Sequence, residues 1–234
     1  VVDWKLTLEL HLVPALLIAV LLWSSLGMMR EVSTERTTLS VYLSGMRTMF
    51  AYRQTLAVMV SNTLITMGRL SILAFFPIYI KETLDYSAFV LGVYLALLYV
   101  MGIFSQPVMG VLSDRIGRKV ILVPSFLAMG VLYVAIVVSS DGVWLGLVIG
   151  ALGMFFYPIL NITQTAIMDV APKGVQASTM GVMGLFAQPF LLVSPVVAGY
   201  LVTKIGIMSA FWYAAVTAFL AALILVPVRF RRNI

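Results

Sequence analysis

Residues 110–119 read GVLSDRIGRK, and they interrupt an otherwise apolar part of the sequence with one acid and three bases. The apolar runs on either side, residues 88–109 and 119–138, each reach the ~20 residues that a helix needs to cross a bilayer. A short charged segment between two such runs is typical of a loop that joins two membrane-spanning helices at the membrane surface. This stretch therefore predicts helices that cross a membrane and are joined by short polar connections.

The composition of the whole chain supports that prediction. Charged residues make up 10% of the chain, against about 25% in soluble domains, and apolar residues make up 62%. The pattern predicts an all-α, polytopic helical membrane protein with about seven spans. A β-barrel is excluded because its strands alternate apolar and polar residues, and these runs do not. The predicted spans are residues 8–28, 55–80, 88–109, 119–138, 143–168, 176–201 and 206–228.

The distribution of lysine and arginine predicts which ends of the spans face the cytoplasm. Eleven of these bases lie on the same side as residues 110–119, three lie on the opposite side, and Arg69 lies within a span. Because cytoplasmic loops are enriched in Lys and Arg, residues 110–119 are predicted to be cytoplasmic. The net charge of +6 is then explained by the bases in the cytoplasmic loops, which set the orientation in the membrane. No nucleic-acid partner is expected.

The charged stretch also carries a recognisable pattern of residues, G-x-x-x-D-R-x-G-R-[KR], directly after a span. This pattern resembles the signature of the major facilitator superfamily, whose members are transporters built from two six-helix bundles. Two further segments also resemble that family. MDVAPKGVQASTMG at residues 168–181 resembles the acid-x-x-proline loop before the eleventh helix, and SPVVAGYL at residues 194–201 resembles the GPxxGGxL motif of that helix. The matching positions of the signature are Gly110, Asp114, Arg115, Gly117, Arg118 and Lys119.

The resemblance implies a domain organisation. Residues 1–28 correspond to the last helix of the N-terminal bundle, residues 29–54 to the cytoplasmic central linker, and residues 55–234 to the C-terminal six-helix bundle. The chain is accordingly expected to lack the rest of the N-terminal half, which would be its partner. The expected location is the plasma (inner) membrane, crossed several times.

Two interpretations of the charged stretch remain open. In one, its bases only orient the protein and contact anionic lipid headgroups. In the other, which the resemblance implies, Asp114 and Arg118 join charge pairs that hold the cytoplasmic helix ends together in one conformational state. Asp169 is expected to take part, because an acid at the C-terminal end of a span is disfavoured by the helix dipole and needs a basic partner, Arg118 or Arg115.

The local geometry of the stretch is predicted as a hairpin. Gly110 and Gly117 are expected to allow close helix approach and a tight turn. Asp114 is expected just before the span 119–138, where a helix N-terminus favours a carboxylate. Lys119 is expected at the level of the lipid headgroups.

Polar side chains within spans are the best indication of a substrate site, because burying them in a bilayer is costly. Two groups of three have the spacing i, i+4, i+7, which places each group on one face of its helix. The resemblance identifies these helices as the seventh and tenth of the family, which both border the central cavity. The candidate substrate-binding residues are Asn62, Thr66 and Arg69 in one helix and Tyr157, Asn161 and Gln164 in the other.

Arg69 is the most informative of these candidates. It lies about 20 Å along its span from the cytoplasmic start, and none of the nine acids lies near that depth. Its counter-charge is expected to come from a substrate anion, a carboxylate of the missing helices or backbone carbonyls, unless the side chain snorkels outward. Tyr157, next to Pro158, alternatively marks a bend, and the other polar side chains alternatively bond neighbouring helices.

Together the residues and the resemblance predict a secondary active transporter that moves a small solute by alternating access. The transport is expected to be coupled to an ion, a proton or sodium, and a proton carrier would have to come from the missing half. The sequence holds no nucleotide-binding loop, metal-ligand cluster or nucleophile constellation, so we expect neither an enzyme nor a cofactor or metal site. The alternative is a non-transporting receptor or assembly subunit that reuses the fold.

Overall fold

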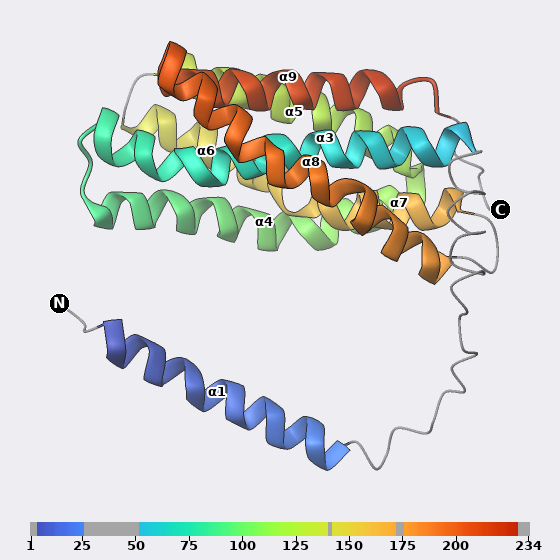
Figure 1. Cartoon of the computed structure of the whole chain (residues 1–234), viewed down its shortest axis with the longest axis horizontal. Coiled ribbons are helices and arrows are strands. Elements are labelled where there is room, and N and C mark those ends of the chain that lie inside the picture. Colours follow the sequence, from blue (N-terminus) through green and yellow to red (C-terminus); the bar gives the residue numbers. More distant parts are fainter. Residues whose placement is uncertain (1–3, 26–51, 140–141, 172–175, 229–234) are drawn as a thin grey trace. The chain divides into compact units, whose positions relative to one another are not determined.

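The computed structural model (Figure 1) describes residues 4–25, 52–139, 142–171 and 176–228. The chain divides into two units, Val1–Tyr42 and Leu43–Ile234. The first unit contains α1, Trp4–Ser25, a 22-residue helix with Pro14 inside it. The expected linker, residues 29–54, lies outside the described residues except for its last three.

The second unit is a helix bundle, and the prediction of an all-α polytopic membrane protein is confirmed. Six helices among the described residues are long and apolar enough to cross a membrane, and one of them, Val143–Val170, consists of two consecutive helices. The described apolar part of α1, Leu12–Ser25, is shorter than these spans. The helices of the bundle are α3 (Arg53–Ile78, continued by the π-helix η2, Tyr79–Thr83), α4 (Ala88–Ile116), α5 (Arg118–Val138), α6 (Val143–Phe156), α7 (Pro158–Val170), α8 (Gln176–Ile205) and α9 (Met208–Leu225).

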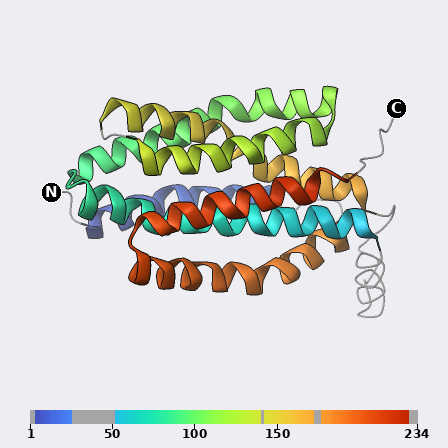
Figure 2. The same cartoon turned by 90° about the horizontal axis from the view of Figure 1, so that it is seen from above.

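Small residues let the central helices of the bundle approach closely. Figure 2 shows α3 and α9 in the middle of the bundle, with α8 on one side and α4, α5 and α6 on the other. A Cβ added at Gly68 of α3 would meet the Thr217 hydroxyl and the backbone of Ala214 in α9. Ser61 and Ser71 of α3 donate hydrogen bonds to carbonyls of α9 at 3.0 and 3.3 Å. Close backbone approach and serine bridges are how membrane helices associate without a hydrophobic driving force.

A second close approach joins α4 to α6 at Gly153. A Cβ added there would lie 2.5 Å from the Leu98 carbonyl oxygen and 3.0 Å from its Cα. Both neighbours are backbone atoms, so the two helices themselves would have to move apart. Glycine at this position therefore sets the spacing of α4 and α6.

Replacing Gly153 with alanine is expected to destabilise the bundle by about 1–3 kcal/mol, the usual cost of overpacking a tight contact. The measurement is thermal or denaturant unfolding of the detergent-solubilised protein. Gly92→Ala is the matched control, because a Cβ at Gly92 in α4 meets nothing within 4 Å. Alanine there should be neutral or stabilising, since it is the better helix former. Equal losses from the two variants would show that the α4–α6 contact is not as tight as described.

The predicted hairpin at residues 110–119 is wrong in its extent. α4 continues to Ile116 and α5 begins at Arg118, so Gly117 alone separates the two helices. Its φ of 106° explains why glycine stands there, because other residues rarely adopt that conformation. Gly110 lies inside α4, and a Cβ there would meet nothing within 4 Å, so it makes no close helix approach. One glycine costs a helix only about 1 kcal/mol, and polar residues continue a helix readily beyond the apolar core.

Candidate functional site

Arg69 lies inside the bundle and not at its surface. Only 5% of the residue is exposed, and its guanidinium carbon lies 4.2 Å from the centroid of the Phe156 ring and 5.6 Å from that of Tyr157. The negative faces of the two rings stabilise the cation where water cannot reach it. Protein therefore encloses the guanidinium in this conformation.

The aromatic surroundings leave the charge of Arg69 only partly compensated. Among the described residues no carboxylate lies within 4 Å of the guanidinium, and its Nε has no hydrogen-bond partner. The hydroxyl of Tyr133 in α5, a fully buried residue within electrostatic range of Arg69, also lacks a partner. Buried polar groups without partners are costly to stability.

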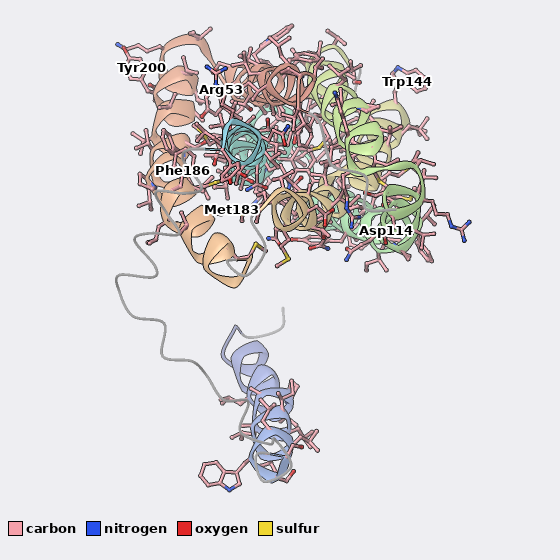
Figure 3. The ribbon with its side chains drawn as sticks, turned by 90° about the vertical axis from the view of Figure 1, so that its right-hand side faces the viewer. Arg53, Asp114, Trp144, Met183, Phe186 and Tyr200 are labelled. Carbon is pink, nitrogen blue, oxygen red and sulfur yellow. The ribbon has the colours of Figure 1, made fainter. Side chains whose placement is uncertain are left out.

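Of the other two candidates on α3, Asn62 contacts α8 and Thr66 bonds within its own helix. The side-chain nitrogen of Asn62 lies 3.8 Å from the Met183 sulfur, while its side-chain oxygen is buried without a partner. Met183 is labelled on α8 in Figure 3. The Thr66 hydroxyl donates to the Asn62 carbonyl of its own helix at 2.7 Å. Asn62 and Arg69 of the predicted shared face contact neighbouring helices in the described bundle.

The second group of candidates begins at a helix break. The predicted span 143–168 is interrupted at Tyr157, where α6 ends and α7 begins with Pro158. Proline has no N–H and so cannot bond the Met154 carbonyl one turn earlier. The Ser105 hydroxyl of α4 donates to that carbonyl instead, at 2.7 Å. The bend that was the alternative interpretation of Tyr157 is therefore present, and the same bend places its ring beside Arg69.

Removing the Ser105 hydroxyl is expected to cost about 1–2 kcal/mol, because Ser105→Ala leaves the part-buried Met154 carbonyl without this donor. Thr163→Val is the matched control, since the buried Thr163 hydroxyl bonds only the Ile159 carbonyl of its own helix. Unfolding measured by near-ultraviolet circular dichroism should show a clearly larger loss for Ser105→Ala. A loss no larger than that of the control would mean that another group satisfies the carbonyl.

The structure brings Tyr157 to Arg69 but leaves Asn161 and Gln164 further along α7. Asn161 is exposed and Gln164 is half-buried. Tyr157 stacks on Tyr99 of α4, with ring centroids 4.8 Å apart. Sequence reasoning missed Phe156, Tyr133 and Tyr99 as neighbours of Arg69, because aromatic residues in apolar spans usually pack in the core or face lipid. The Phe–Tyr–Pro sequence at the helix break was the one indication available.

Asp114, Arg118 and Asp169 form a charge cluster at the bundle end where α3 begins. Figure 3 labels Asp114 of this cluster. Arg118 donates from Nε to the Asp169 carboxylate at 3.0 Å and from Nη1 to the Ser113 hydroxyl at 3.2 Å. It also pairs with Asp114, four residues earlier. The ion pair expected for Asp169 is therefore present, and Arg118 makes it.

Each of these three charges lies at an unfavourable helix end. Asp114 is in the last turn of α4 and not before α5 as expected, Asp169 is in the last turn of α7, and Arg118 is the first residue of α5. Acids at C-termini and a base at an N-terminus are all opposed by the helix dipole. The three residues compensate one another, so separating the helix ends would leave each charge in a position that the local structure disfavours.

The comparisons with known proteins agree with these observations. The model of the Major Facilitator Superfamily matches residues 58–233. Tetracycline resistance protein, class E, of Escherichia coli is 30% identical over 137 residues, 57% of this chain and 32% of that protein. Multidrug resistance protein MdtG of Proteus mirabilis (strain HI4320) is 26% identical over 157 residues, 65% of this chain and 39% of that protein.

The match to these relatives thus covers well under half of their length. The family model, in contrast, covers all six spans of the bundle, together with the helix break at Pro158 and the charge cluster around Arg118. This chain belongs to the Major Facilitator Superfamily and is an integral, multi-pass membrane protein.

Proposed function

We propose that this chain is the C-terminal part of a secondary carrier that moves a small solute across the plasma membrane by alternating access. In this proposal residues 55–234 form the C-terminal bundle, residues 1–28 supply the last helix of the N-terminal bundle, and residues 29–54 link the two on the cytoplasmic side. The carrier type is supported by the family, whose inverted repeats rock about a site near the middle of the membrane.

The position of Arg69 is the single observation that supports a substrate path next to α3 and α7. A cation buried among aromatic rings, with no carboxylate close by in the described bundle, needs its counter-charge from elsewhere. A solute or an acid of the N-terminal bundle would supply that charge when the two bundles close around the site. Asn62, Thr66, Tyr157, Asn161 and Gln164 are the proposed polar contacts around it.

The proposed solute is a small amphiphilic compound with an anionic or strongly polar group. Arg69 favours the polar group, and the tetracycline and multidrug resistance proteins that resemble this chain favour a drug-like compound. The aromatic and methionine side chains near Arg69 and Asn62 suit its apolar part. Transport is driven in this proposal by a proton or sodium gradient.

The charge cluster is the proposed cytoplasmic gate. Asp114 is 64% exposed and Asp169 is 38% exposed, so each ion pair with Arg118 contributes only about 0.2–1 kcal/mol. Contacts of that strength form and break readily during a transport cycle. Gly110, Arg115, Gly117 and Lys119 complete the gating motif, with Gly117 as the turn that brings α4 and α5 together.

The test is transport by the full-length protein. Expressed in an efflux-deficient bacterium, it should raise tolerance to at least one compound from a panel of tetracycline, a cationic dye and a neutral amphiphile. The purified protein in proteoliposomes should then move that compound against its gradient, and only when a proton or sodium gradient is imposed. Saturable binding of a compound without flux would contradict the proposal and favour a receptor.

A further inference from the structure

An apolar groove runs along α4 and α5 toward the charged end of the bundle. It has a volume of about 480 Å³, and α6 contributes to its floor. Its wall on α4 includes Phe104 and Val108, which are 71% and 64% exposed, and its wall on α5 includes Pro124. Short side chains, Ser125 and Ala128, make the depression between the two helices.

The groove continues toward the end of α4. A second recess of about 430 Å³ shares Val108 and Leu112 with the first and also includes Arg115. From Met101 to Leu112 the groove follows twelve residues of α4, about 16 Å of helix. This length corresponds to one leaflet, because the apolar core of a bilayer is about 30 Å thick.

The end of the groove carries positive charge that no acid in the described part of the chain pairs with. Arg118 occupies both acids of the cluster, Asp114 and Asp169. Arg115 and Lys119 make no ion pair with any residue in the described part of the chain. Arg115 is exposed, and Lys119 directly precedes Val120, which lines the groove. The groove is therefore apolar along one leaflet and cationic at the level of the headgroups.

We propose that this groove binds an anionic phospholipid, with one acyl chain between α4 and α5 and the phosphate at Arg115 and Lys119. A lipid matches both features at once, because its chain length fits the apolar part and its charge complements the two bases. A soluble anion would use the bases alone, and a partner helix would not need them. The proposal concerns the outer surface of the bundle and does not depend on which solute is carried.

The headgroup part is tested with the full-length protein purified in a neutral detergent. Phosphatidylglycerol and phosphatidylcholine with identical acyl chains are added, and binding is followed by native mass spectrometry and by the unfolding temperature. Phosphatidylglycerol should bind more tightly and raise the unfolding temperature further. The double variant Arg115→Gln and Lys119→Gln should weaken phosphatidylglycerol binding by about 30-fold, from the usual contribution of two interfacial bases, and leave phosphatidylcholine unchanged.

Arg53→Gln is the matched control. Arg53 is an exposed base that begins α3 at the same end of the bundle, and Figure 3 shows it on a different side from Asp114. The control should keep the preference for phosphatidylglycerol. If it removes the preference as strongly as the double variant does, the effect is one of general charge and the proposal fails. Equal binding of the two lipids by the unaltered protein would also overturn it.

The acyl part is tested by filling the groove. Ala128→Phe should reduce the binding of both lipids, and Val108→Trp fills the same groove from an exposed position if the first variant does not fold. Retained binding in a folded groove variant would place the lipid elsewhere. A change of oligomeric state without any change in lipid binding would show that the groove is a protein interface.

Discussion

Replacing Arg69 with methionine is expected to abolish transport while leaving the protein folded. Removing a charge that pairs with a solute or another helix in a water-excluded site costs about 2–5 kcal/mol, which corresponds to at least a roughly 30-fold loss of transport rate. The measurement is the initial rate of flux in proteoliposomes for the compound that the unaltered protein carries.

The stability of the same variant distinguishes this role from a structural one. Placing an arginine at the centre of a bilayer helix costs about 2.5–3.5 kcal/mol, and contact with aromatic faces returns about 2 kcal/mol when water is excluded. Methionine removes both contributions, so the unfolding free energy should stay the same or rise slightly. A variant that carries solute normally, or one that loses transport only because it unfolds, would contradict the proposed role.

Replacing Arg118 with glutamine is expected to slow transport with little change in solute affinity. The variant leaves Asp114 and Asp169 unpaired, each at the C-terminal end of a helix where a negative charge is disfavoured. Losing two partly exposed ion pairs should shift the balance of conformational states by about 0.4–2 kcal/mol, or about 2- to 30-fold. Transport rate and solute affinity should be measured on the same preparation.

Asp114→Asn and Arg53→Gln complete that experiment. Asp114→Asn should give a smaller effect in the same direction, because Arg118 keeps its pair with Asp169. Arg53→Gln changes the charge at the same end of the bundle without touching the cluster, and it should transport normally. An Arg118→Gln variant that loses affinity at an unchanged maximal rate would exclude the gating role.

The fold could be predicted from the sequence because hydropathy identifies the segments that lie in the bilayer. Long apolar runs can only be helices there, so the spans were predicted correctly in number within the bundle and in place to within a few residues. The errors lie where helices leave the apolar core. α4 extends seven residues beyond its predicted end at residue 109, since hydropathy marks the end of the bilayer and not the end of the helix.

The site was predicted less completely than the fold. Spacing along one helix predicted a shared face for Asn62, Thr66 and Arg69, but it could not show what that face contacts. The rings that enclose Arg69 belong to α5 and to the junction of α6 and α7, so only the packing of the bundle reveals them. The pair between Arg118 and Asp169 was accessible from sequence because an acid at a helix C-terminus requires compensation.

In the proposed mechanism this bundle lines a solute path that opens to one side of the membrane at a time. The chain contains no cysteine. Once any native cysteines elsewhere in the full-length protein are removed, the single cysteine of Asn161→Cys can be labelled selectively. The measurement is the rate at which the introduced cysteine reacts with a membrane-impermeant thiol reagent, applied from each side of the membrane in turn. Val131→Cys is the control, because Val131 lies on an apolar, exposed part of α5. The cysteine at position 161 is expected to react, and the carried solute should slow that reaction. Arg118→Gln should accelerate it when the reagent is applied from the cytoplasmic side. The cysteine at position 131 should not react. Absence of reaction at position 161 from both sides, or a rate that neither the solute nor Arg118→Gln changes, would contradict the proposed mechanism.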